Sequence, residues 1–166
     1  MAKRARTATP APALEDAAPT AWTADNEALQ FMKVLWALVH ALEVRSKRMA
    51  RTIGVTGPQR LVVRAIGRQP DATAGDLARM LDLHASTLTG VLARLEARGV
   101  IARHVDPEDR RRARFSLTAA GRRVDRERKG TVEAAVRRTL TRLPDTTAAH
   151  GRALIDALVQ ELARPD

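Results

Sequence analysis

Cysteine and tyrosine are both absent from this 166-residue chain, which also contains only two tryptophans and two phenylalanines. The absence of thiols excludes disulfides, thiolate metal sites and thiol-based redox sensing. With so few aromatic side chains, a core must be built mostly from leucine, valine, isoleucine and alanine, and the 45% apolar content is sufficient for one. This composition favours packed helices over a β-sandwich.

Long apolar runs are also absent, and no segment approaches the length of a membrane span. The first 22 residues, MAKRARTATPAPALEDAAPTAW, lack the continuous apolar region of a secretory signal. We therefore expect a cytoplasmic protein with no membrane partner. Nucleophile motifs and metal-ligand spacings are missing as well, so we expect no enzyme, no metal and no cofactor. The histidines surveyed for such spacing are His40, His84, His104 and His150.

Positive charge is in excess, since 29 Lys and Arg stand against 19 Asp and Glu, a net charge of +10. A polyanion is the natural partner of such a chain, and an anionic membrane is the rival. Alternatively, the 25 arginines reflect only a GC-rich genome. The location of the charge is more informative, because residues 94–129 hold twelve basic and six acidic side chains and so carry +6 of the +10.

The N-terminal third of the chain contains two segments of different character. Residues 1–24 are rich in Ala, Pro and Thr and predict a flexible arm, either simply disordered or able to trail over a nucleic acid. Residues 25–55 carry apolar side chains at helical spacing, with Asp25 as a candidate N-cap and Gly54 as a stop. The predicted helix is longer than a small domain needs, so its remainder is expected to contact another helix or another subunit.

Two short helices follow a longer one in the middle of the chain. Thr56-Gly57-Pro58 predicts the start of a helix with Leu61 among its inward residues, and Thr73-Ala74-Gly75-Asp76 fits a capping box. The next stretch, HASTLTGVLARLEARG (residues 84–99), predicts a further helix that stops at Gly99. The pair indicates a helix-turn-helix, or else an ordinary helical hairpin.

A β-hairpin is predicted directly afterwards. Residues 100–105 can form a strand, residues 112–117 alternate polar and apolar side chains, and residues 106–111 are turn-rich. A hairpin in this position is a wing. Thr118 then caps a predicted long helix that runs to about Thr141, and a last helix starts at Pro144.

Two motifs give the chain its resemblance to a known family. The pattern D-x-R, five residues and L-T-x-x-G is matched by Asp109, Arg111, Leu117, Thr118 and Gly121. The pattern S/T, seven residues and L-E-x-x-G is matched by Thr87, Leu95, Glu96 and Gly99. Over roughly residues 27–163, the chain resembles the MarR family of winged helix-turn-helix transcription regulators.

The resemblance implies a mainly α fold with a small β-hairpin wing and an obligate homodimer. The winged helix-turn-helix domain would comprise residues 56–118, flanked by an N-terminal dimerisation helix at 25–55 and C-terminal dimerisation helices at 119–166. The implied partner is double-stranded DNA with a pseudo-palindromic operator, whose half-sites lie roughly 34 Å apart.

The predicted DNA contacts come from the recognition helix and the wing. Small polar groups at the start of the helix suit base edges, later arginines suit phosphates, and wing arginines suit a minor groove. The candidates are His84, Ser86, Thr87, Thr89, Gly90, Arg94, Arg98, Arg110, Arg111 and Arg112. Asp109 is expected to pair with Arg111 and shape the turn, and Ser86 can alternatively be only a helix cap.

The resemblance also implies a small-molecule effector, aromatic or anionic, that releases a repressor from DNA. Candidate pocket residues are Trp36, His40, Arg45, Met49 and Arg64, although Trp36 and Met49 can equally be core and Arg45 solvated. Without cysteine, the peroxide-sensing mode of one branch of the family is excluded. A ligand-independent regulator, an architectural protein and a transcriptional activator remain alternatives.

Overall fold

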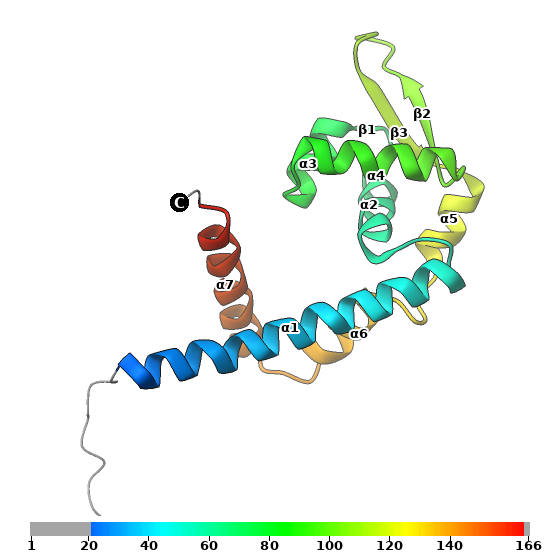
Figure 1. Cartoon of the computed structure of the whole chain (residues 1–166). Helices are drawn as coiled ribbons and strands as arrows, with labels where there is room; N and C mark the ends of the chain where they lie inside the picture. Colours follow the sequence, from blue (N-terminus) through cyan, green and yellow to red (C-terminus); the bar gives the residue numbers. More distant parts are fainter. Residues whose placement is uncertain (1–20, 165–166) are drawn as a thin grey trace, which may run out of the picture. The chain divides into compact units, whose positions relative to one another are not determined.

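The computed structural model describes residues 21–164, which form seven helices and three short strands (Figure 1). The elements are α1 (Ala21–Thr52), α2 (Gly57–Arg68), β1 (Ala72–Thr73), α3 (Ala74–Leu81), α4 (Ala85–Ala97), β2 (Ile101–Val105), β3 (Ala113–Leu117), α5 (Ala119–Arg126), α6 (Val132–Leu140) and α7 (Asp145–Leu162). The predicted mainly α fold with a hairpin wing is confirmed. The chain divides into two units, one ending at Val39 within α1 and the other beginning at His40.

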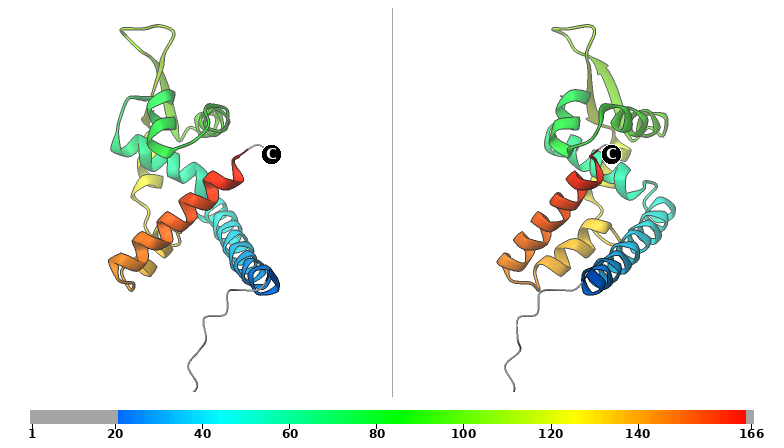
Figure 2. Two further views of the ribbon diagram at one scale, coloured as in Figure 1. Left: turned by 90° about the vertical axis from the view of Figure 1, so that its left-hand side faces the viewer. Right: turned by 60° about the vertical axis from the view of Figure 1, so that its left-hand side comes forward.

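The sheet is antiparallel and has the order β1-β3-β2. In the hairpin, Ile101 pairs with Leu117 and Val105 with Ala113, and its loop projects from the second unit in both views of Figure 2. Strand β1 adds the pair Ala72 and Phe115 on the other edge of β3. The sequence did not predict β1, because two residues are too few to show a period of two.

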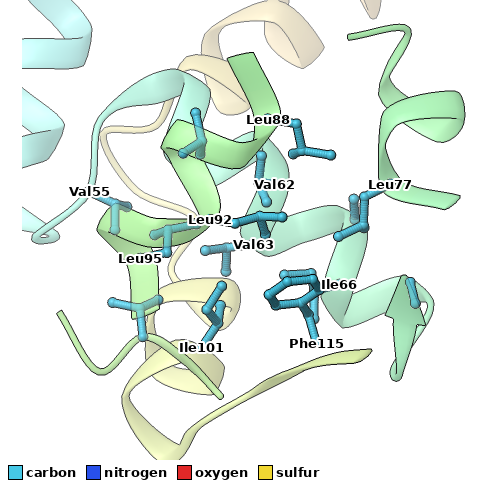
Figure 3. Close-up of a cluster of buried hydrophobic side chains, with 14 residues drawn as sticks. Val55, Val62, Val63, Ile66, Leu77, Leu88, Leu92, Leu95, Ile101 and Phe115 are labelled. Carbon is cyan, nitrogen blue, oxygen red and sulfur yellow. The ribbon is translucent and has the colours of Figure 1, made fainter. Parts of the chain in front are cut away.

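One apolar core lies beneath this sheet and between α2, α3 and α4 (Figure 3). Helix α4 buries a single face at the spacing of a helical stripe, as predicted, through Leu88, Val91, Leu92 and Leu95. Helix α2 buries Val62, Val63 and Ile66, whereas Leu61 is 46% exposed. The prediction that Leu61 faces inward was wrong, because it lies on the face of α2 opposite to that of the core.

Capping boxes are present at the starts of two helices, and the one at Thr73 was predicted. Thr56 accepts a hydrogen bond from the Gln59 amide, and Thr73 accepts one from the Asp76 amide at 3.2 Å. The Asp76 carboxylate in turn accepts from the hydroxyl and the backbone amide of Thr73, at 2.7 and 3.0 Å. These bonds, with a smaller contribution from Arg79, lower the pKa of Asp76 to about 2.

Helix α1 begins at Ala21, so Asp25 lies inside the helix and does not cap it. Residues 1–20 of the predicted arm fall outside the described residues. The helix ends at Thr52, two residues before the expected stop at Gly54.

The long helix predicted from Thr118 to Thr141 is instead two helices, α5 and α6. Gly130 adopts φ +71°, a backbone conformation that does not continue a helix, and Thr131 restarts the chain by accepting the Ala134 amide at 3.1 Å. The charged run before Gly130 was assigned to the same helix as Val132, which concealed this Gly-Thr signal. The break separates the helix attached to the winged domain from the C-terminal helices.

The L-T-x-x-G motif fastens α5 to the end of the recognition helix. Thr118 Oγ1 lies 2.6 Å from the Gly99 carbonyl oxygen and accepts the Gly121 amide at 3.1 Å. A Cβ atom at Gly121 would lie only 2.1 Å from the Val100 carbonyl oxygen. Glycine is therefore required at position 121 because backbone fills the space of a side chain.

Gly121→Ala is expected to lower the free energy of unfolding by about 2 kcal/mol or more, because α5 must move away from Val100. Urea titration followed by circular dichroism measures the change. Gly75→Ala is the matched control, since a Cβ there meets only the Thr73 hydroxyl at 3.8 Å. A loss in the control as large as that in Gly121→Ala would contradict the steric argument.

Asp76 predicts a pH dependence of stability. A carboxyl whose pKa is about 2 in the folded protein and 3.8 ordinarily stabilises the fold above that ordinary value, and the contribution is lost as pH falls toward 2. Unfolding free energy measured between about pH 5 and pH 2 should therefore fall less steeply in Asp76→Asn than in the wild type. Equal slopes in the two proteins would contradict the assignment.

Candidate nucleic-acid interface

The start of α4 presents a small polar surface to solvent. His84 is the N-cap residue, with φ −60° and ψ 139°, and its side chain makes no capping hydrogen bond. Ser86, Thr87 and Thr89 are exposed, whereas Gly90 is half-buried. Ser86 lies within the first turn of the helix, so the alternative that it caps α4 is wrong.

Two of the side chains predicted to contact DNA form hydrogen bonds with backbone carbonyls of α4 itself. The Thr89 hydroxyl donates to the Ala85 carbonyl at 2.7 Å, and its oxygen can still accept a hydrogen bond. Arg94 Nε donates to the Gly90 carbonyl at 2.9 Å. This bond directs the guanidinium of Arg94 back along α4 toward the polar surface.

Arg98 lies at the other end of α4. Its Nη1 donates to the Gly54 carbonyl at 2.9 Å, across the loop between α1 and α2. The structure therefore does not bring Arg98 to the polar start of the helix.

The tip of the wing is organised by Asp109. One carboxylate oxygen accepts the Arg111 amide at 3.0 Å, and the other lies 3.6 Å from Arg112 Nε. The expected pairing of the Asp109 and Arg111 side chains was wrong: Asp109 contacts the backbone of Arg111 and the guanidinium of Arg112. Within residues 21–164, the exposed guanidinium groups of Arg110 and Arg111 form no hydrogen bond or ion pair, so the turn leaves their charges available.

A second pair, where the loop of the wing leaves β2, was missed from the sequence. The Asp106 side chain is 4% exposed, lies 2.8 Å from Arg114 Nε and accepts the Glu108 amide at 2.9 Å. The hydrogen bond from Arg114, followed by that from the Glu108 amide, holds the pKa of Asp106 below its ordinary value. The available sequence signal was an Asp-Pro turn start followed, eight residues later, by an Arg on the returning strand.

The wing and the helix-turn-helix enclose a groove of about 710 Å³. Thr89 of α4 lines it together with Thr73 of β1 and Asp76 of α3. Its arginines come from α3, β2 and the wing, and they are Arg79, Arg103, Arg111 and Arg112. The structure thus brings Thr89 of α4 and Arg111 and Arg112 of the wing to one groove, and it adds Arg79 and Arg103, which the sequence did not single out.

The five predicted effector residues have different environments. Met49 is fully buried and is therefore core, and Arg45 Nη1 donates to the Gly130 carbonyl at 3.5 Å. Arg64 forms an ion pair with Asp125 at 2.7 Å and lines a groove of about 790 Å³ over α2 and α6. His40 and Trp36 are exposed, and Trp36 belongs to the other unit of the chain.

Metal and membrane features were sought in the part of the chain that the structure describes. No group of three or more His, Asp or Glu side chains there is placed to hold a metal ion. No helix among those residues combines the length and the apolarity that crossing a bilayer requires.

Comparison with known sequences gives a consistent set of relatives. A family model described as MarR family matches residues 53–112. The transcriptional regulator HosA of Escherichia coli is 39% identical over 70 residues, which are 42% of this chain and 52% of HosA. An HTH-type transcriptional repressor of Mycobacterium tuberculosis is 31% identical over 91 residues, 55% of this chain and 66% of the repressor. The chain thus matches about half to two thirds of the length of these curated relatives.

Solved structures support the same assignment. MepR of S. aureus in complex with DNA superposes with a TM-score of 0.65 at 19% identity, covering 80% of this chain and 97% of MepR, a likeness of fold. PcaV of Streptomyces coelicolor, crystallised with its natural ligand, has a TM-score of 0.59 at 26% identity and covers 74% of this chain and 89% of PcaV. The family model, the sequence relatives and the winged fold agree: this chain belongs to the MarR family of winged helix-turn-helix transcription regulators.

Proposed function

We propose that the protein binds double-stranded DNA as a homodimer and represses transcription from a pseudo-palindromic operator. The observation that carries this proposal is the groove that Thr89 of α4 lines together with Arg111 of the wing, an arginine whose charge is uncompensated. MepR, with the same fold, was crystallised with DNA, as was AbfR, which superposes with a TM-score of 0.63 at 21% identity. The protein acts by binding, in the cytoplasm, and not as an enzyme.

Helix α4 enters the major groove with its N-terminal turn leading. The exposed hydroxyls of Ser86 and Thr87, the His84 ring and the hydroxyl oxygen of Thr89 then face base edges, and Gly90 allows a close approach. Arg94 contacts phosphate from the same side. Arg98 contacts phosphate from the far end of the helix through guanidinium protons that Gly54 does not occupy.

The wing enters an adjacent minor groove. Arg110 and Arg111 supply the charge, because Asp109 attracts the neighbouring Arg112 and holds the turn. A narrow A·T-rich groove has the more negative potential and therefore favours such arginines.

Dimerisation uses helices at both ends of the chain, residues 25–55 and 119–166. Each exposes large apolar side chains that a monomer would leave in water: Trp36 is 66% exposed on α1, and Val159 is 60% exposed on α7. An isologous dimer buries them and places two recognition helices roughly 34 Å apart.

A small aromatic or anionic effector releases the repressor. PcaV was crystallised with its natural ligand. In this chain, the groove beside Arg64 places cations next to apolar side chains, a combination that suits an organic carboxylate. The cations include Arg68 and Arg137, and the apolar side chains include Leu61 and Val136.

The second candidate function is an activator with the same DNA contacts. The relative BadR of Rhodopseudomonas palustris, 33% identical over 93 residues, is named a transcriptional activatory protein.

Selection of bound fragments from the source genome tests the function. We expect a palindromic consensus, and its absence would contradict sequence-specific regulation.

On the recovered operator, Arg110→Ala should weaken binding at least about tenfold and reduce the dependence of affinity on salt. Arg138→Ala on α6 removes the same charge away from the wing and should bind like the wild type. Unchanged binding by Arg110→Ala would contradict the wing assignment.

The dimer is tested by sedimentation velocity. Val159→Asp places a charge in the proposed interface and should convert a dimer into a monomer at micromolar concentration, because an unpaired buried charge is costly. Gln160→Asp adds the same charge to the neighbouring exposed position and should leave the dimer intact. A wild type that sediments as a monomer would contradict the proposal.

A further inference from the structure

Arg60 of α2 is an arginine in the interior, with a side chain only 1% exposed. Its guanidinium donates to the backbone carbonyls of Val124 and Glu127, and its Nε lies 2.7 Å from Glu133 Oε1. Val124 is in the last turn of α5, Glu127 follows that helix, and Glu133 is in the first turn of α6. One side chain of α2 therefore holds both sides of the break between α5 and α6.

Arg64, one turn further along α2, continues this arrangement. Its Nη1 lies 2.7 Å from Asp125 Oδ1 and 3.3 Å from the Asp125 carbonyl oxygen, which also accepts from Arg128 at 2.6 Å. The carbonyls at the end of a helix have no partner within it and attract cations. Here they are satisfied largely by side chains from another helix.

The break itself has few restraints of its own. Glu127 Oε1 accepts the amides of Arg128 and Lys129 at 2.8 Å each, and Thr131 caps α6. The residues between these contacts are exposed, except for Thr131, and Gly130 has positive φ. Arg45 of α1 reaches the Gly130 carbonyl oxygen only at 3.5 Å, so the shorter contacts from α2 are the main ones from another helix that set the direction in which α6 leaves α5.

We propose that Arg60 and Arg64 form a clamp, the α2 clamp, that positions the winged domain relative to α6. Helix α5 moves with the winged domain because Gly121 is packed against Val100, whereas α6 begins the helices assigned to the dimer. On the proposed function, on which this inference rests, the clamp thereby sets the separation of the two recognition helices. Arg60 and Arg64 are positioning residues and do not contact DNA.

Simple stabilisation does not account for an arginine at position 60. An apolar side chain can fill a buried site at equal or lower cost, because burying an ion pair requires the removal of water from both charges. A guanidinium instead presents donors in a fixed planar fork, which hold three acceptors in one geometry. The fork therefore fixes the angle between α5 and α6. Loss of the clamp is expected to widen the range of angles between these two helices rather than to unfold either of them.

The test uses the full-length protein and copies of the selected operator whose half-sites are one or two base pairs closer or farther apart. The wild type should prefer the natural spacing by about tenfold or more, since half-site separation is a geometric requirement. Glu133→Gln, which keeps the shape and removes the charge, and Arg60→Met should reduce this preference to about threefold or less. Gln69→Ala, which truncates an exposed side chain just beyond the end of α2, should keep the wild-type preference.

Equal loss of affinity at every spacing, or an unchanged preference in both clamp variants, would overturn the proposal, since a merely structural role does not change the ratio. Hydrogen exchange of the DNA-free protein distinguishes a failure of the clamp proposal from a failure of the proposed DNA binding. If the wild type binds no operator, faster exchange of amides 127–135 in Glu133→Gln, with the winged domain unchanged, still supports the clamp. Unaltered exchange there would refute it.

Discussion

The packing of Gly121 against the Val100 carbonyl is the constraint on which the winged domain depends. At this point α4 has just ended, β2 begins, and α5 starts beside them; Thr118 joins the three by contacting the Gly99 carbonyl oxygen and capping α5. The hairpin register continues directly from it, with Ile101 opposite Leu117. Since the backbones meet without an intervening side chain, the recognition helix, the wing and α5 form one body whose parts keep their relative positions.

The role of an ion pair in this protein depends on whether one of its two side chains is buried. The pairs Asp106–Arg114 and Arg60–Glu133 each contain one nearly buried member, so losing a partner would leave a charge with little access to water. Exposed pairs such as Asp109–Arg112 contribute little to stability, and their role is to shape a turn. In the wing, Asp106 and Asp109 thus form ion pairs with Arg114 and Arg112. The arginines without such a partner form the basic surface available to DNA.

Local features were predicted well from the sequence because their causes lie within a few residues. The buried face of α4 follows from a repeat of apolar residues along one helix, and the Thr73–Asp76 box from two side chains three positions apart. The errors have equally specific causes. The charged residues before Gly130 were assigned to the opening of one long helix, which concealed the break, and Leu61 fitted an apolar pattern whose buried face was determined by packing against α4 and the sheet.

By itself, the sequence determined most of the succession of helices and strands, the Thr73 capping box and the small polar side chains at the start of α4, because each depends on residues close together in the chain. Tertiary structure alone decided the partners of the charged groups. Arg60 and Glu133 are 73 residues apart, and many arginines could have met that carboxylate. Which one does so depends on how α2 packs beside α5 and α6. Pairing within the wing commits Arg114 to Asp106 and Arg112 to Asp109, and it leaves the charges of Arg110 and Arg111 at the surface.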